Sequence, residues 1–145
     1  MWENKTVSLV IITILVLSTV YITKIDEAKG TNVAILYVGG SGPGNYTTIQ
    51  DAIDNASDGY TVFVFNGIYY ENVAVDKQLN LIGESKNDTI IDAGGSGSAV
   101  RVSADWVKIS DFTLQNSGNG WYTAGILLSS SSNYNTITKN KIINN

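Results

Sequence analysis

Residues 109–116 read ISDFTLQN and residues 137–144 read ITKNKIIN, so one outline of apolar and polar positions occurs twice. A second pair, residues 100–103 (VRVS) and residues 126–129 (ILLS), recurs at a slightly shorter spacing. The two extra residues of the longer spacing fit in the serine run at 129–132. A period in the twenties with several short strands per period is typical of a solenoid, in which each repeat stacks on its neighbours.

Short strand candidates fill the chain on both sides of this repeat. Most alternate apolar and polar residues, which buries one face of the strand and leaves the other in water. They are shorter than the strands of most sandwiches and up-and-down barrels, so we expect an all-β, parallel β-helix. The expected strands are residues 34–38, 61–65, 72–75, 79–82, 89–92, 99–102, 106–109, 112–114, 125–128, 136–138 and 141–143.

A β-helix needs sharp corners, and Asn and Gly tolerate the left-handed backbone angles that such corners require. Asn116, Asn140 and Asn144 stand where corners are expected. Stacked Asn side chains can also bond to one another along the axis of the coil.

Residues 48–56 carry the only helical period after the N-terminal segment. Ile49, Ala52, Ile53 and Ala56 fall at i, i+3, i+4 and i+7, and a threonine at 47 or 48 can cap the start. Because the first turn of a solenoid exposes its core and an unpaired strand edge, we expect this helix to cover that end. Residues 31–60 would then hold the first strand and the capping helix, and residues 61–145 the turns.

The N-terminal residues 1–30 predict a signal peptide or a membrane anchor. Residues 7–22 are almost all apolar, Lys5 precedes them, and charged residues follow. No small-x-small cleavage site is evident, so the segment is either cut or retained as an anchor over residues 7–25. Either way we expect an extracellular or cell-surface location. Three sequons for N-glycosylation then become candidates, at Asn45, Asn55 and Asn87.

Composition excludes several functions. The chain has 145 residues, enough for one domain, and it contains no Cys and no His. Disulfides, thiol nucleophiles, Cys/His zinc sites and imidazole-based triads are therefore excluded. A net charge of -4 and a pI near 4.6 argue against a nucleic-acid partner, which needs clustered Lys and Arg.

Several stretches resemble a known family. They resemble the opening of pectin-lyase-like right-handed parallel β-helix proteins, and the later repeat resembles that of NosD-like and archaeal or bacterial cell-surface β-helix proteins. The resemblance spans about residues 35–145 and implies a right-handed coil. The stretches are residues 37–42 (YVGGSG), 46–53 (YTTIQDAI), 58–62 (DGYTV), 67–73 (GIYYENV) and 135–142 (NTITKNKI).

One short pattern, Gly67-x-Tyr69-x-Glu71, is also found in pectin methylesterases. In that family the catalytic acids come from later motifs, and neither Gln-Asp-Thr-Leu nor Asp-Phe-Ile-Phe-Gly occurs here. Polygalacturonase-like signatures need a His that this chain lacks. These residues therefore support neither the esterase nor the hydrolase activity.

A lyase would need calcium-binding carboxylates and a basic residue that abstracts a proton. Asp92, Asp105 and Asp111, with Arg101 and Lys108, are the residues that could supply this chemistry. The simpler interpretation is that Asp105 and Asp111 are turn residues and the two cations keep a strand face soluble. We expect no metal site and no cofactor, with calcium only under the lyase hypothesis.

The remaining candidates are aromatic. Trp121, Tyr122 and Tyr134 stand in loop or corner regions, where exposed rings could stack on a pyranose, or could instead pack over the base of the loop. The chain stops at Asn144-Asn145 without a closing cap, which suggests an N-terminal fragment of a longer protein or end-to-end self-association.

These observations predict an exported, non-catalytic β-helix protein with a structural or adhesive role at the cell surface. Its expected partner is a polysaccharide or cell-envelope glycan. The alternative is the N-terminal part of a carbohydrate-active enzyme, a pectate-lyase-like or pectinesterase-like protein, whose active site lies in further turns.

Overall fold

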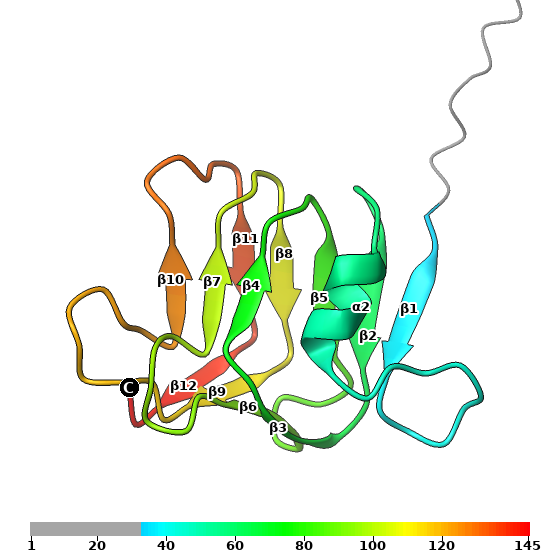
Figure 1. Ribbon diagram of the computed structural model, residues 1–145, viewed down its shortest axis with the longest axis horizontal. Coiled ribbons are helices and arrows are strands. Elements are labelled where there is room, and N and C mark those ends of the chain that lie inside the picture. The colour runs from blue at the N-terminus through cyan, green and yellow to red at the C-terminus, as the bar shows by residue number, and fades with distance from the viewer. Residues whose placement is uncertain (1–32) are drawn as a thin grey trace, which may run out of the picture. The chain divides into compact units, whose positions relative to one another are not determined.

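The structure, a computed structural model that describes residues 33–145, is a right-handed parallel β-helix (Figure 1). Every strand pairs in parallel with a strand at the same position of a neighbouring turn, which confirms the predicted fold. The predicted signal or anchor segment lies outside the described residues. Within residues 33–145, no helix is long and apolar enough to span a membrane.

Within residues 33–145 the strands form three parallel sheets of five, four and three strands. The described chain visits them in that order in each turn and completes three full turns, with the first strand and the helix before them and two strands after them. The five-stranded sheet contains β1 (Ile35–Val38), β2 (Thr61–Val64), β5 (Asn80–Gly83), β8 (Lys108–Ser110) and β11 (Thr136–Thr138). The four-stranded sheet contains β3 (Gly67–Tyr70), β6 (Thr89–Asp92), β9 (Thr113–Gln115) and β12 (Lys141–Ile143). The three-stranded sheet contains β4 (Val73–Val75), β7 (Val100–Val102) and β10 (Ile126–Leu128).

The strand register confirms the internal repeat read from the sequence. Ile137 lies opposite Ile109, and Ile126 lies opposite Val100. The connection from β10 to β11 is longer by two residues than the connection from β7 to β8, so the extra residues are accommodated in the serine-rich loop as expected.

The core consists of rows of apolar side chains that stack along the coil axis. In the five-stranded sheet, Val62, Leu81 and Ile109 occupy one register position and are all fully buried. Burying one such side chain stabilises the fold by about 1.5–3 kcal/mol. The outward residues of the same strands alternate with them, which is the pattern that predicted the strands.

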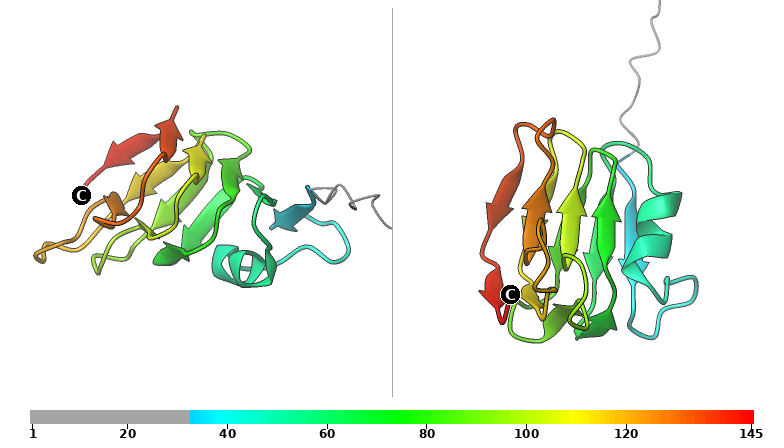
Figure 2. Two further views of the ribbon diagram at one scale, coloured as in Figure 1. Left: turned by 90° about the horizontal axis from the view of Figure 1, so that it is seen from above. Right: turned by 60° about the vertical axis from the view of Figure 1, so that its left-hand side comes forward.

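Helix α2 (Ile49–Asn55) covers the first turn of the coil, as expected (Figure 2). The side chain of Thr48 caps its N-terminus by accepting a hydrogen bond from Asp51 N, and the helix packs on β1, β2 and β4. Gln50 also protects the open edge of β4. Its side-chain amide accepts from Ala74 N at 2.8 Å and donates to Ala74 O at 3.3 Å, as a neighbouring strand would.

The C-terminal end of α2 is held by a cation from the first complete turn. Lys77 Nζ donates hydrogen bonds to three carbonyl oxygens in the last helical turn and the cap, and its positive charge suits the negative end of the helix dipole. These carbonyls belong to Ile53, Asp54 and Ala56.

Left-handed backbone angles recur at three corners, at equivalent positions of the last two turns. Asn116 and Asn144 take positive φ as predicted, but the prediction for Asn140 was wrong, because Lys139 takes the left-handed angle at that corner. The three pairs are Trp106 and Tyr134, Asp111 and Lys139, and Asn116 and Asn144.

Three Asn side chains at these corners, those of Asn135, Asn140 and Asn145, bond to the main chain of the turn before rather than to one another. Asn140 Oδ1 accepts from Phe112 N, 28 residues earlier, and its Nδ2 donates to Ile109 O, 31 residues earlier. Asn135 and Asn145 repeat both contacts at the same separations. Each of these three Asn follows a left-handed residue and satisfies the polar groups of the corner beneath it.

Two details of the strand prediction were wrong. Strand β3 was missed, because Gly67 followed by Ile68 and two tyrosines does not show the alternation that marks the other strands. The strand expected at 106–109 begins only at Lys108, because Trp106 turns the corner with a φ of 58°.

A substitution at Gly83 tests how closely successive turns of the coil approach one another. A methyl group on Gly83 would collide with the carbonyl oxygen of Asp111 in the next turn, and backbone atoms cannot rotate away. We expect Gly83→Ala to lower the free energy of unfolding by about 2 kcal/mol in urea melts. Gly120→Ala is the matched control, because its methyl group would meet only Thr123 Cγ2, at 3.5 Å. Equal stability of the two variants would contradict the close stacking of turns at this position.

Candidate functional site

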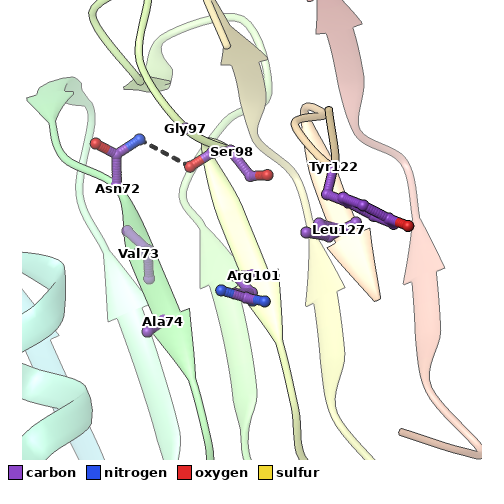
Figure 3. Close-up of a pocket in the computed structure, with 8 residues that line it drawn as sticks. All are labelled: Asn72, Val73, Ala74, Gly97, Ser98, Arg101, Tyr122 and Leu127. Carbon is purple, nitrogen blue, oxygen red and sulfur yellow. Dashed lines mark hydrogen bonds between the residues drawn. The ribbon is translucent and has the colours of Figure 1, made fainter. Parts of the chain in front are cut away.

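The outer face of the three-stranded sheet carries a shallow groove of about 250 Å³ (Figure 3). Ala74, Arg101 and Leu127 occupy one register position on β4, β7 and β10 and form its floor. Tyr122 lines it from the loop before β10, and none of the lining residues is acidic. The groove therefore combines one cation with apolar surface.

The polar rim of this groove is fixed by hydrogen bonds. Asn72 Nδ2 donates to Ser96 O at 2.7 Å and to Ser98 O at 2.9 Å, and the second bond is drawn in Figure 3. Ser98 Oγ in turn accepts from Ala124 N at 3.1 Å. These contacts join the loops of three successive turns, so the groove is largely pre-formed.

The three predicted aromatic residues do not form one site. Trp121 and Tyr122 share a loop and are 94% and 85% exposed, so neither ring is packed over the loop base. Tyr134 instead stacks on Trp106, with ring centroids 4.4 Å apart. Trp106 was expected in a strand and not among the site residues, although it stands one repeat before Tyr134 and this spacing pairs the two rings.

The residues proposed for a lyase site are distributed over different parts of the coil. Arg101 lies on β7, Lys108 on β8 and Asp92 on β6, which belong to three different sheets. Asp105 and Asp111 lie in the connections before and after β8. Within residues 33–145, no group of three acidic side chains could hold a metal ion.

Asp92 has a structural role. Its carboxylate accepts hydrogen bonds from Gln115 Nε2 at 2.7 Å, Asn116 Nδ2 at 2.8 Å and Gly94 N at 2.9 Å. The bond from Gln115 is the largest of the effects that lower the pKa of Asp92, and the bonds from Gly94 and Asn116 act in the same direction against burial. The side chain thus links two turns of the coil.

Glu71, in the pattern shared with pectin methylesterases, caps helix α2. Its two carboxylate oxygens accept from Ile49 N at 2.9 Å and Gln50 N at 3.0 Å, which suits the positive end of the helix dipole. The hydroxyl of Tyr69 donates to Phe65 O at 2.8 Å, and Gly39 packs directly against that hydroxyl. The motif therefore builds the N-terminal end of the coil.

The three sequons differ in how their Asn side chains are engaged. Asn45 Nδ2 donates to Gly39 O at 2.6 Å within the glycine-rich loop, and Asn55 Nδ2 donates to Asp51 O at 2.8 Å at the end of α2. Asn87 is exposed in the turn between β5 and β6, and its side-chain amide makes no hydrogen bond to the rest of residues 33–145. Asn87 is therefore the most accessible of the three candidates.

No family model matches the chain. A probable pectinesterase/pectinesterase inhibitor 32 of Arabidopsis thaliana is 29% identical over 110 residues, which are 71% of this chain and 20% of that protein. A cell surface glycoprotein of Methanothermus fervidus is 37% identical over 84 residues, which are 56% of this chain and 14% of that protein. The chain thus spans a fifth or less of the length of these curated relatives.

Solved structures show the same fold. A pectin methylesterase in complex with a hexasaccharide matches with a TM-score of 0.59 and 20% identity over 70% of this chain and 41% of that chain. Pectin methylesterase PemA from Erwinia chrysanthemi matches with a TM-score of 0.54 and 17% identity over 77% of this chain and 45% of that chain. The predicted resemblance to pectin-lyase-like β-helix proteins is confirmed for the fold.

The lowered pKa of Asp92 makes a prediction about acid stability. Its charged form stabilises the folded chain above the ordinary Asp pKa of 3.8, and this contribution is lost as the pH falls through the lower folded value. We expect Asp92→Asn to lower the free energy of unfolding by about 2 kcal/mol near neutral pH. The deficit should shrink in urea melts below about pH 4.

Asp76→Asn is the control for Asp92→Asn, because it removes the same charge from an exposed position. It should change the stability by less than about 0.5 kcal/mol. A constant deficit of Asp92→Asn down to about pH 2 would contradict the role of the carboxylate charge.

Proposed function

We propose that this chain binds an acidic cell-envelope polysaccharide along the outer face of its three-stranded sheet and serves a structural or adhesive role there. The observation that carries the proposal is that Arg101 and the exposed Tyr122 line the same groove, which no acidic residue lines. A second shallow groove, lined by Arg101, Tyr122 and Ser129 among others, continues this surface beyond β10.

The chemistry of these side chains suits a sugar that carries a carboxylate. The apolar face of a pyranose ring packs on an aromatic ring such as that of Tyr122 or Trp121. The planar guanidinium of Arg101 can donate two parallel hydrogen bonds to a carboxylate. Because the chain as a whole has a net charge of -4, this local cation would set the orientation of the glycan rather than attract it from a distance.

A location outside the cell membrane goes with this role. The apolar run at residues 7–25 follows a basic residue, as an export signal or anchor does. The likeness to a cell surface glycoprotein supports the same location. Glycosylation at Asn87, the most accessible sequon, belongs to this proposal.

A carbohydrate esterase is the second candidate. It is favoured by the likeness to pectinesterases in sequence and to pectin methylesterases in fold. In this proposal residues 33–145 supply the N-terminal turns of the coil and the groove, and further turns supply the reacting groups.

Retention on polyuronate tests the binding proposal. In affinity electrophoresis through gels that contain polygalacturonate, the chain should be retarded, and Arg101→Gln should weaken binding at least tenfold, because a charge-assisted hydrogen bond contributes about 1.5–3 kcal/mol. Tyr122→Ala should weaken binding by a similar factor.

Lys86→Gln is the matched control, because it removes one positive charge from an exposed turn away from the groove. Its retention should equal that of the unaltered chain. Equal losses in Lys86→Gln and Arg101→Gln would reduce the effect to net charge and overturn the proposed groove.

Methanol release from methyl-esterified pectin tests the esterase candidate. The protein tested is the chain together with any further turns that its gene encodes. If the esterase candidate is right, this protein releases methanol from methyl-esterified pectin. Retention on polyuronate without methanol release would leave binding as the function, and methanol release would replace it with catalysis.

A further inference from the structure

One corner of the coil places four residues at equivalent positions in successive turns. Register pairs Thr61 with Asn80, Asn80 with Lys108, and Lys108 with Thr136. The residues two positions before each of these therefore succeed one another along the coil axis. They are Gly59, Gln78, Trp106 and Tyr134.

The last two members of this series form an exposed aromatic stack. The rings of Trp106 and Tyr134 lie 4.4 Å apart at 12°, yet the residues remain 56% and 70% exposed. Both have left-handed φ, 58° and 56°, which is unusual for bulky side chains. Backbone strain that brings little burial points to a role in binding.

The first two members leave space beside the stack. A groove of about 260 Å³ is lined by Gly59, Gln78, Asn80, Trp106 and Lys108, among others. The residues that line this groove come from the turn of Trp106 or from earlier turns, whereas Tyr134 lies in the turn after Trp106. The groove therefore lies on the side of the indole away from Tyr134. Gly59 has no side chain, and a methyl group there would meet nothing within 4 Å.

We propose that this corner is a second glycan site, in which the ring of a neutral sugar stacks on Trp106 and extends the aromatic stack toward the N-terminal turns. The apolar face of a pyranose matches the indole face. The side-chain amide of Gln78 and the Oδ1 of Asn80, whose Nδ2 donates to Thr61 Oγ1 at 3.2 Å, face sugar hydroxyls as donors and acceptors.

The charges around the corner select a neutral sugar. Lys108 is the cation of the groove, but Asp58 and Asp105 stand next in sequence to Gly59 and Trp106. The two carboxylates accept hydrogen bonds from Gln78 N at 3.1 Å and Asn133 N at 2.6 Å. Their charges offset that of Lys108, so this site lacks the net positive charge of the groove around Arg101 and is distinct from it.

Affinity electrophoresis through gels of galactan, mannan or amylose tests this second site in the full chain. The chain should be retarded in at least one of these neutral gels, and Trp106→Ala should weaken that binding at least tenfold. Gln78→Phe is the decisive variant, because the added ring fills the groove without removing a described contact of the Gln78 side chain. It should abolish retardation while the melting temperature stays unchanged or rises.

Arg101→Gln and Tyr122→Ala are the controls, since they alter only the other groove. They should leave retention on the neutral glycan unchanged, and Gln78→Phe should leave retention on polygalacturonate unchanged. No retardation in any of the three neutral gels would overturn the second site, as would full retention of Gln78→Phe. Either result would leave the polyuronate groove standing.

Discussion

Parallel main-chain pairing between successive turns is the constraint from which the other features follow. Thr136 N donates to Val107 O and Lys141 N to Phe112 O, both at 2.8 Å, and this pairing fixes each position of one turn against the same position of the next. Residues at the same position of successive turns therefore share one environment and form rows along the coil axis. One row becomes the buried core of Val62, Leu81 and Ile109, and another becomes the exposed aromatic stack.

The rows explain why so much of the fold could be predicted from the sequence. A repeat must return the same residue type to the same environment, so the recurrence of Ile109 as Ile137 marks both strand and register. The left-handed corner residue was harder to predict. Lys139 turns where Asn140 was expected, because the adjacent Asn side chain is needed to bond the corner beneath it.

The candidate site could be predicted only in part, because side-chain roles here depend on partners from other turns. From the sequence alone, the carboxylates of Asp92 and Glu71 could be assigned a catalytic role. In the structure Asp92 accepts a hydrogen bond from Gln115 and Glu71 accepts one from the start of α2, and both partners are distant along the chain. The sequence indicated Tyr122 and Tyr134 as candidate exposed rings. It did not show that they lie apart, because that depends on the strand register, which stacks Tyr134 on Trp106. Both proposed glycan surfaces therefore lie on outer faces of a coil in which carboxylates such as those of Asp92 and Glu71 hold segments from different turns together.

Scalar couplings through hydrogen bonds, measured by NMR on labelled protein, test the stacked coil most directly. Parallel stacking predicts a coupling from the amide nitrogen of Thr136 to the carbonyl carbon of Val107, and another from Lys141 to Phe112. Couplings from these amides to carbonyls of a sequence-adjacent strand, as in antiparallel hairpins, would contradict the account.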